Sequence, residues 1–450
     1  MEDAIIQANA IIPNGYVATA KSITYDGATM PVIIADGGQL IHKNEGVYAL
    51  VEKEITGYTG EKDHYYLIGV PQYDLSSINP ANVQHMLEND YDLYSFDPAT
   101  ADGLEWRNYK VTGQQFNLGY GIGYLYANSE DVTLSVETIL QPLYDEGYTA
   151  GFAVCNNYFA LSYTNGGNNP FNGWNLVSNP WAFSGYMYVY DPFNNEVVSQ
   201  DFYRMGENGI EAIASQGTVA PWEAVFVEAT AENQFAVVYF EPLDLNAKVL
   251  NMTVSQNGGL VDNARIRFGK GHGLVKFQLN PNHTKLYIHQ DNKNYAVVYS
   301  EENMGEMPVS FEAESNGTYT LNFTTEELSF AYLHLIDNLT GIETDLLQTT
   351  SYSFEARTTD YTSRFKLVFC SKVPEPVEGP NQSFAFYSNG SWVINNEGRA
   401  VLQVVDVNGR IIKSESINGC ANINFNAAPG VYMLRLINGE NVMVQKVVVK

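Results

Sequence analysis

Seven histidines carry the widest chemical repertoire in this chain, because imidazole binds metals and transfers protons near neutral pH. His283 and His289 lie in "HTKLYIH", which alternates like a β-strand, so both face one side but sit roughly 20 Å apart by the usual strand rise. His334 in "AYLHLID" would share a strand face with Tyr332 and Ile336. No HExxH, HxH or Cys/His cluster accompanies them, so we expect structural histidines and no metal site.

Signals for other catalytic chemistry are equally sparse. A nucleophile elbow, GxSxG, is absent. The glycine-rich runs "GYGIGYLY" (119–126) and "FGKGHGLV" (268–275) lack the loop-to-helix context of a phosphate site, and we expect turns there. No pair of carboxylates stands out for glycoside hydrolysis, whose geometry is three-dimensional. The sequence therefore predicts a protein that is not an enzyme and needs no cofactor.

Acidic side chains gather in one stretch, "ENDYDLYSFDPATADGLEW" (88–106). Asp90, Asp92, Asp97 and Asp102 offer the carboxylate oxygens that Ca²⁺ prefers, although their spacing is not that of an EF-hand. Asx-rich turns use the same residues. A structural calcium ion thus stays open as the alternative to a solvated turn.

Aromatic side chains are the remaining lead, at 13% of the chain with 31 Tyr and 22 Phe. An exposed Trp can stack on a sugar ring or contact a protein, whereas a buried one serves the core. Trp106, Trp181 and Trp222 are the candidate ligand contacts. Trp174 takes the place of Tyr65 in the internal repeat described below, so we expect it in the core.

The charge balance excludes some partners. With 51 Asp and Glu against 24 Lys and Arg, the formal net charge is -27, which repels nucleic acid and anionic membranes. No apolar run is long enough to span a bilayer. Cys155, Cys370 and Cys420 lie far apart in sequence and imply no disulfide framework.

Strand periodicity dominates the chain. Runs such as "ARIRFGKGHGLVKFQL" and "GTYTLNF" place apolar residues at every second position between turn residues. Short helical patterns occur only near 4–10, 82–89 and 136–145. We therefore predict an all-β protein of several antiparallel β-sandwich domains in tandem, jelly-roll or Ig-like, with few short helices.

An internal echo suggests a duplicated module. Three segments, "YYLIGVP" (65–71), "DLYSFDP" (92–98) and "GIGYLYA" (121–127), are followed in the same order by "WNLVSNP" (174–180), "YMYVYDP" (186–192) and "WEAVFVEA" (222–229). Pro71 would then correspond to Pro180 and Asp97 to Asp191. The expected modules are an N-terminal β segment, two related sandwiches and a third sandwich, at residues 1–60, 61–150, 151–245 and 246–370.

A Pro-rich connector, "SKVPEPVEGPNQS" (371–383), precedes a final module at 384–450. Asn408-Gly409 and Asn438-Gly439 mark two hairpins, and about seven strands fit a small Ig-like sandwich. Residues 442–449 would form its last strand, followed by Lys450 at the sheet edge.

The final module contains "LQVVDVNGRIIKS", "APGVYMLRLING" and "QKVVVK" in that order. With these three motifs it resembles the C-terminal sorting domain of the type IX (Por) secretion system of Bacteroidetes. The residues that carry these sorting motifs are Asp406, Gly409, Arg410, Pro429, Gly430, Tyr432, Gly439, Lys446 and Lys450. The resemblance implies recognition by the secretion machinery and export to the outer cell surface or the medium. It also implies an N-terminal signal peptide, which "MEDAIIQANAIIPNGYVATA" does not provide, so we expect a processed form of a longer precursor.

Segments such as "GWNLVSNPWAF" are similar to repetitive, adhesin-like exported proteins of the same bacteria, and "TMPVIIADGGQLIHKN" resembles the last rungs of a β-helix stalk. The expected function is therefore adhesin-like binding at the cell surface, with a glycan or a protein as the ligand. Two alternatives are a carbohydrate-binding accessory region of a larger secreted hydrolase and a structural surface-layer component.

Overall fold

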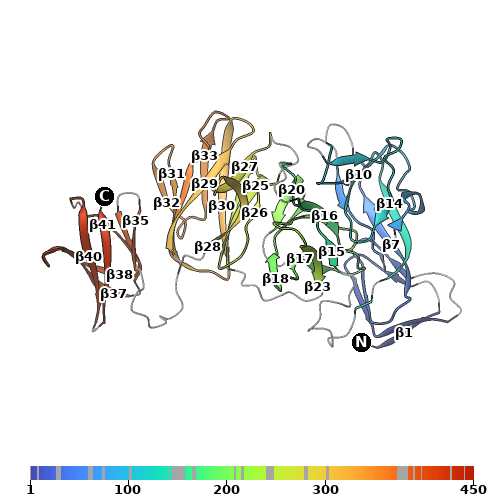
Figure 1. Ribbon diagram of the computed structural model, residues 1–450, viewed down its shortest axis with the longest axis horizontal. Coiled ribbons are helices and arrows are strands. Elements are labelled where there is room, and N and C mark those ends of the chain that lie inside the picture. Colours follow the sequence, from blue (N-terminus) through green and yellow to red (C-terminus); the bar gives the residue numbers. More distant parts are fainter. Residues whose placement is uncertain are drawn as a thin grey trace. The chain divides into compact units, whose positions relative to one another are not determined.

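The fold was analysed in a computed structural model of the chain. It describes residues 2–7, 10–26, 32–58, 64–72, 77–100, 104–140, 142–143, 158–164, 169–206, 209–213, 217–239, 248–277, 282–300, 304–371, 384–388, 391–396, 398–425, 428–439 and 441–449. Strands make up nearly all of the regular structure (Figure 1), and one 3₁₀ turn, η1 (Pro80–Asn82), is the helical element among these residues. The predicted all-β class with several separate sheets is confirmed.

The chain divides into two compact units. The first comprises Met1–Leu245 and Gly271–Leu279, and the second comprises Asn246–Lys270 and Asn280–Lys450. The expected boundaries near 60 and 150 fall inside the first unit, where they stay predictions.

The first unit begins with parallel ladders between strands about twenty residues apart. Its strands are β1 (Asp3–Ile6), β2 (Ile11–Ile12), β3 (Val17–Ala20), β4 (Ser22–Tyr25), β5 (Val32–Ile34), β6 (Gln39–His42) and β7 (Tyr48–Ile55). β1 pairs with β4, β3 with β6, and β2 with β5, which pairs in turn with β7. Strands that stack in parallel on successive turns of the chain are the arrangement of β-helix rungs.

Two of the predicted helices are wrong within the described residues. Residues 4–6 belong to β1, and 136–139 belong to β14 (Val132–Ile139), which pairs along its whole length with β7. Apolar side chains in these short runs fit both a helical and a strand period, and sheet pairing decides between them. The third candidate, 82–89, contains only the end of η1 and turns.

The rest of the first unit forms three larger sheets, in the orders β11-β10-β13-β8, β16-β22-β19-β20 and β15-β23-β17-β18, with β21 beside β17. A further short pair joins β9 to β12. The strands are β8 (Tyr66–Ile68), β9 (Ser77–Ile78), β10 (Tyr91–Phe96), β11 (Trp106–Asn108), β12 (Leu118–Gly119), β13 (Tyr124–Asn128), β15 (Tyr158–Ala160), β16 (Trp174–Ser178), β17 (Gly185–Asp191), β18 (Glu196–Ser199), β19 (Phe202–Gly206), β20 (Gly209–Ile213), β21 (Thr218–Val219), β22 (Ala224–Glu228) and β23 (Phe235–Tyr239).

The two copies of the internal repeat, each made of three segments, agree only in part in how their strands pair. β8 pairs with β13 and β16 pairs with β22, so the first and third strands of the echo correspond. The middle strands do not, because β10 pairs with β13 whereas β17 pairs with β23 in another sheet. The correspondence of Asp97 with Asp191 is therefore wrong: aromatic alternation marks a half-buried strand but not the sheet that it joins.

The second unit contains the third sandwich, whose strands form one continuous path, β32-β31-β34-β29-β27-β28-β25-β24-β30-β33. Both ends of this path contribute side chains to a single core, so the path folds over itself into two layers. Its strands are β24 (Val249–Gln256), β25 (Gly259–Phe268), β27 (Lys285–Gln290), β28 (Lys293–Ser300), β29 (Met304–Glu312), β30 (Gly317–Glu326), β31 (Phe330–Asp337), β32 (Ile342–Asp345), β33 (Ser351–Ala356) and β34 (Phe365–Ser371).

A buried ion pair lies at one end of this sandwich. The Arg364 guanidinium donates to both carboxylate oxygens of Asp337 at 3.1 and 2.9 Å, and the two side chains are 2% and 0% exposed. Burial raises the pKa of Asp337, but hydrogen bonds from Arg364 and Tyr352 outweigh it and hold the pKa below the ordinary value. This stabilisation is present above the ordinary carboxyl pKa and is lost as the pH falls through the lowered one.

Replacing Asp337 by Ala should destabilise the third sandwich by about 3–5 kcal/mol, because the buried Arg364 would keep only the Asp360 carboxylate, 3.3 Å away, as an ionic partner. A matched control is Glu306→Ala, which breaks the more exposed pair of Glu306 with Lys366 (3.2 Å) and should cost about 0–1 kcal/mol. Denaturant titration with hydrogen exchange of residues 304–371 compares the two variants. Equal losses would contradict the assignment of Asp337 as a structural anchor.

Candidate functional site

The C-terminal sandwich holds the motif residues on a fold of seven described strands in two sheets, β35-β36-β39 and β38-β37-β40-β41. They are β35 (Ala385–Ser388), β36 (Ser391–Ile394), β37 (Arg399–Asp406), β38 (Ile411–Asn418), β39 (Ala421–Ile423), β40 (Gly430–Asn438) and β41 (Asn441–Val449). Trp392, Leu402, Leu434 and Leu436 lie in a core that is separate from the core of the third sandwich. The seven strands form a sandwich of a three-stranded and a four-stranded sheet, as the sequence predicted.

Asp406 organises the hairpin between β37 and β38. Its carboxylate accepts hydrogen bonds from the amides of Asn408 and Arg410 at 2.9 Å and from the Arg410 guanidinium at 2.7 Å. Gly409 supplies the left-handed conformation that the turn needs, with φ at 82°. The Arg410 amide and guanidinium hold the pKa of Asp406 below its ordinary value. This local network gives a physical reason for the Asp-x-x-Gly-Arg spacing.

The second and third motifs form the paired strands β40 and β41. Tyr432 faces the core and its hydroxyl donates to the Ala428 carbonyl at 2.8 Å, which closes the turn that contains Pro429 and Gly430. The ladder runs from Gly430 opposite Val449 to Asn438 opposite Asn441, with Gly439 at the turn (φ 58°). Lys446 points away from the core, and Lys450 lies outside the described residues.

Gln445 is a structural position that sequence reasoning missed. Its side-chain oxygen accepts from the amides of Phe384 and Ala385 at 2.7 and 2.8 Å, and its nitrogen donates to the Ala385 carbonyl at 2.5 Å. The terminal strand thus secures the start of β35 in the opposite sheet. No local sequence pattern predicts these hydrogen bonds, because Ala385 and Phe384 are 60 and 61 positions away from Gln445.

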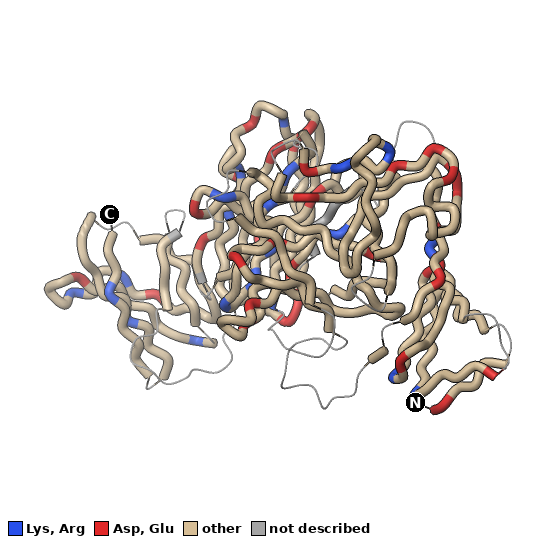
Figure 2. Tube along the Cα trace, turned by 45° about the vertical axis from the view of Figure 1, so that its right-hand side comes forward, with Lys and Arg blue, Asp and Glu red and all other residues tan. Residues whose placement is uncertain are grey.

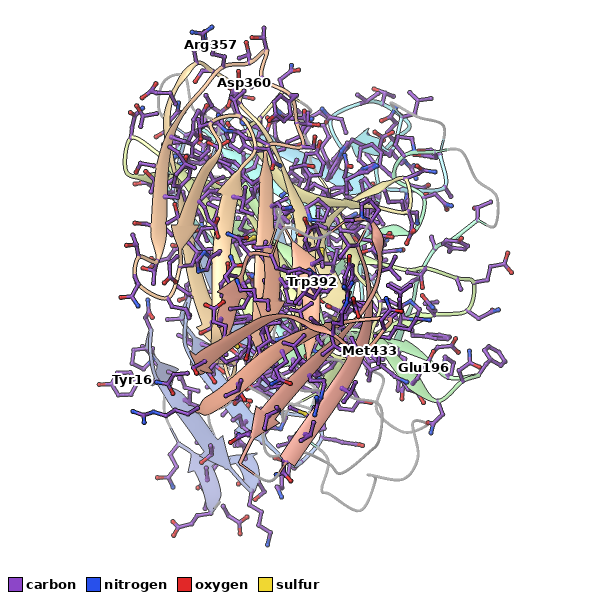
Figure 3. The ribbon with its side chains drawn as sticks, turned by 90° about the vertical axis from the view of Figure 1, so that its left-hand side faces the viewer. Tyr16, Glu196, Arg357, Asp360, Trp392 and Met433 are labelled. Atoms are coloured by element: carbon purple, nitrogen blue, oxygen red, sulfur yellow. The ribbon has the colours of Figure 1, made fainter. Side chains whose placement is uncertain are left out.

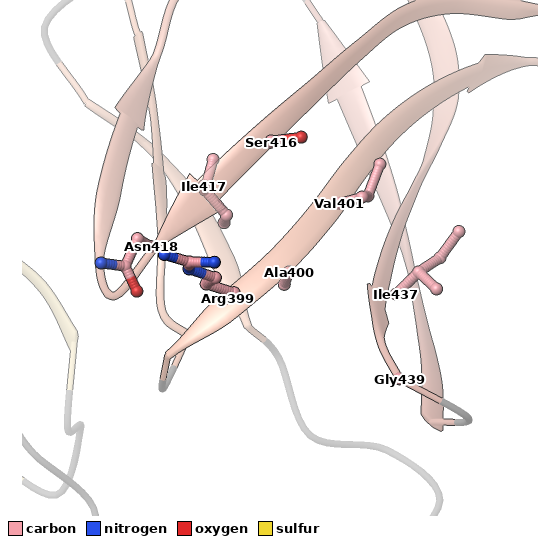
Figure 4. A pocket seen from close by; sticks show the side chains of 8 residues that line it. All are labelled: Arg399, Ala400, Val401, Ser416, Ile417, Asn418, Ile437 and Gly439. Carbon is pink, nitrogen blue, oxygen red and sulfur yellow. The ribbon is translucent and has the colours of Figure 1, made fainter.

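The outer face of the sheet β38-β37-β40-β41 is apolar and has two cations. Strand alternation places side chains of β37, β40 and β41 on the side opposite to the core, among them Val401, Gln403, Val431, Met433, Arg435, Ile437, Val442, Val444, Lys446 and Val448. We call these residues the outer face. A pocket of about 540 Å³ opens at one end of it between β37, β38 and β40, beside Val401, Ser416 and Ile437 (Figure 4). Met433 marks this face in Figure 3.

Charge differs between this module and the rest of the chain. Residues 388–450 contain six Lys and Arg and four Asp and Glu, a formal net charge of +2, whereas residues 1–387 carry -29. Acidic residues are scattered along both units, and Lys and Arg residues are interspersed among them (Figure 2). The acidic surplus therefore belongs to the body of the protein and not to its C-terminal sandwich.

Trp106 is the one predicted ligand contact that reaches the surface within the described residues. It is half-buried on β11, opposite Phe96 of β10, with ring centroids 4.9 Å apart. Trp181 and Trp222 are 5% and 1% exposed, so their prediction as ligand contacts is wrong: both are core side chains. Trp174, expected in the core, is buried there.

Polar groups accompany Trp106 on the same side of its sheet. The residues Tyr65, Asp92, Tyr94, Trp106 and Asn108 are all half-buried, and we call them the aromatic strip. The Tyr65 hydroxyl donates to Asp92 at 3.2 Å, and Tyr94 lies edge-on to Trp106 with centroids 6.5 Å apart. Trp106 also packs edge-to-face on Phe226 of β22, with centroids 6.2 Å apart, so the exposed part of its ring is what can stack on a sugar ring or contact a protein.

The carboxylates considered for calcium have other partners. Lys110 approaches Asp90 at 2.8 Å and Asp92 at 3.5 Å, and its hydrogen bond holds the pKa of Asp90 below the ordinary value. Asp97 caps its own turn by accepting from the Ala99 amide, and Asp102 lies outside the described residues. The described part of the chain holds no group of three or more potential metal ligands.

The three candidate histidines each contact a nearby side chain. His283 lies 3.4 Å from Glu314, His289 2.7 Å from Asn294, and His334 2.8 Å from Glu343. His334 also stacks on Tyr332, at 4.0 Å between ring centroids. These contacts fit histidines at the rims of the sheets.

Comparison with known families gives one match: residues 388–450 fit the family described as "Secretion system C-terminal sorting domain". The predicted sorting domain is thus confirmed for this part of the chain. A solved structure, "Biofilm associated protein - BSP domain", is matched at 9% identity over 88% of this chain and 97% of its own, with a TM-score of 0.15, which is too low to indicate a shared fold. Curated proteins give no match. Within the described ranges, no helix is long and apolar enough to cross a membrane.

Replacing Gln445 by Ala should destabilise the C-terminal sandwich by about 1–3 kcal/mol, because the Phe384 and Ala385 amides lose their acceptor. Hydrogen exchange of residues 384–388 measures the change directly. The matched control is Lys446→Ala, the adjacent residue on the outer face, which should leave that exchange unchanged. Unaltered protection in Gln445→Ala would refute the role of this side chain.

Proposed function

We propose that this chain is an adhesin-like binding protein that the type IX machinery exports to the cell surface or the medium. One observation carries the proposal: the matched residues 388–450 fold around a core of their own. A sorting signal with its own core can be recognised while the preceding domains stay folded around their own cores. This fits a chain in which one domain directs export and the others are the exported cargo.

The outer face is the part of the sorting domain that we propose to contact the secretion machinery. Its valines, Met433 and Ile437 present apolar area, and Arg435 and Lys446 add positive charge. A complementary partner surface would be apolar with acidic groups. The motif residues Asp406, Gly409 and Tyr432 do not belong to the outer face. In this proposal they fix the turns that hold its strands in register.

The exported body would bind its ligand through the aromatic strip. Trp106 and Tyr94 offer ring surface, and Asp92 and Asn108 offer hydrogen-bonding groups beside it, a combination that suits a neutral glycan. The charge of -29 on residues 1–387 disfavours polyanionic ligands. A carbohydrate-binding accessory region of a larger hydrolase would use the same strip, whereas a surface-layer component would need no ligand there. In this proposal the chain itself catalyses no reaction.

A chain that ends at Ser371 should stay inside a type IX-competent host, because it lacks the sorting domain. The sharper variant is the full chain with Val444→Glu and Lys446→Glu, which changes the outer face and spares the core. Its secretion should fall at least tenfold. Val407→Glu alters an exposed apolar residue in the turn after β37, outside the outer face, and should leave secretion unchanged. Normal secretion of the chain that ends at Ser371 would contradict the sorting role.

Trp106→Ala should weaken glycan binding about tenfold or more, as loss of a central aromatic contact does. A glycan array with the purified chain identifies the ligand, and titration measures the change. Phe193→Ala is the control, since Phe193 is 79% exposed in the turn after β17 and lies outside the strip. Equal affinity of Trp106→Ala and the parent chain would refute the strip, and product release from a bound glycan would overturn the non-catalytic assignment.

A further inference from the structure

Two cysteines that are fifty positions apart in sequence lie together in the second unit. Cys370 is fully buried near the end of β34, and Cys420 is half-buried between β38 and β39. They belong to a small apolar cluster, distinct from the cores of the two sandwiches. Its members are Tyr332, Ile336, Val368, Cys370 and Val393, with Phe386 and Cys420 packed against them. The cluster joins the third sandwich to the sorting domain.

Polar contacts in the same place support this arrangement. The side-chain amide of Asn422, in the sorting domain, donates to the hydroxyl of Tyr332, in the third sandwich, at 3.4 Å. The Cys420 sulfur lies 3.4 Å from the Asn395 side-chain oxygen. The apolar cluster and the Asn422–Tyr332 contact therefore hold the turn that carries Cys420 against the third sandwich.

The two thiols interact directly. A hydrogen bond between the side chains raises the pKa of Cys370 and lowers the pKa of Cys420 to about 7. Cys420 is thus the better nucleophile and also the more accessible of the two, while Cys370 is shielded from solvent. This is the asymmetry expected of an attacking and a resolving cysteine.

We infer that Cys370 and Cys420 form a disulfide bond when the exported chain meets a disulfide oxidant, linking the third sandwich covalently to the sorting domain. The Cys420 thiolate attacks the oxidant, forms a mixed disulfide and releases one reduced thiol. Cys370 then gives up its proton and attacks the Cys420 sulfur, which releases the second reduced thiol. Two electrons and two protons pass from the cysteines to the oxidant, which is a thiol–disulfide oxidoreductase or a small disulfide such as oxidised glutathione.

Such a disulfide would set how firmly the sorting domain is attached to the domains that precede it, whatever ligand those domains bind. The Pro-rich connector lies between the two cysteines in sequence. The disulfide would therefore keep the two sandwiches joined even after a cut in the connector, until a reductant opened the bond. Export matters here, since disulfides persist in oxidising compartments.

Mapping of the full chain under non-reducing conditions tests this. After equilibration with oxidised glutathione, unfolding in an alkylating agent and trypsin digestion, residues 367–372 and 414–435 should appear as one linked peptide that separates on reduction. Cys155, which lies outside the described residues, should be alkylated. Cys420→Ser should leave Cys370 alkylated, and Cys370→Ser should leave Cys420 alkylated.

A second readout does not depend on the peptides. Oxidation should raise the unfolding temperature of the sorting domain in the parent chain and in Cys155→Ser, and should not do so in Cys420→Ser. The inference is overturned if Cys370 and Cys420 are both alkylated after oxidation, or if either of them pairs with Cys155.

Discussion

A β-sheet in water must cover at least one of its faces, and in a chain without long helices the cover has to come from another sheet. This constraint divides the protein into sheets that share cores, and it leaves the sorting domain with one covered and one open face. Leu402, Leu434 and Leu436 fill the covered side. Met433, Ile437 and Val444 occupy the open side, where they are available to a partner.

The same constraint explains why the sorting domain is joined lightly to the body. Its core and the core of the third sandwich are separate, and among the described residues a small cluster around Cys370 and Val393 and the Asn422–Tyr332 contact lie between them. The charge follows this division, with the acidic surplus confined to residues 1–387. The formal net charge of +2 on residues 388–450 thus has the opposite sign to the charge of -29 on residues 1–387.

Local patterns predicted what depends on neighbouring residues. Alternation gave the strands, and Asn408-Gly409 and Asn438-Gly439 gave the two hairpins of the sorting domain. What depends on distant pairing was missed or wrong: residues 4–6 and 136–139 are strands, and Trp181 and Trp222 are buried. Gln445 and the Cys370–Cys420 contact could not be found from sequence, because their partners are about fifty to sixty positions away and no periodic pattern links them.

If residues 384–450 are a self-contained sorting signal, they should direct the export of an unrelated protein to which they are fused. A periplasmic reporter with a signal peptide, followed by residues 372–450, would be expressed in a type IX-competent strain and in a strain without the machinery. We predict that the reporter reaches the surface or the medium only in the competent strain. Retention of the folded fusion in the periplasm of both strains would contradict the claim.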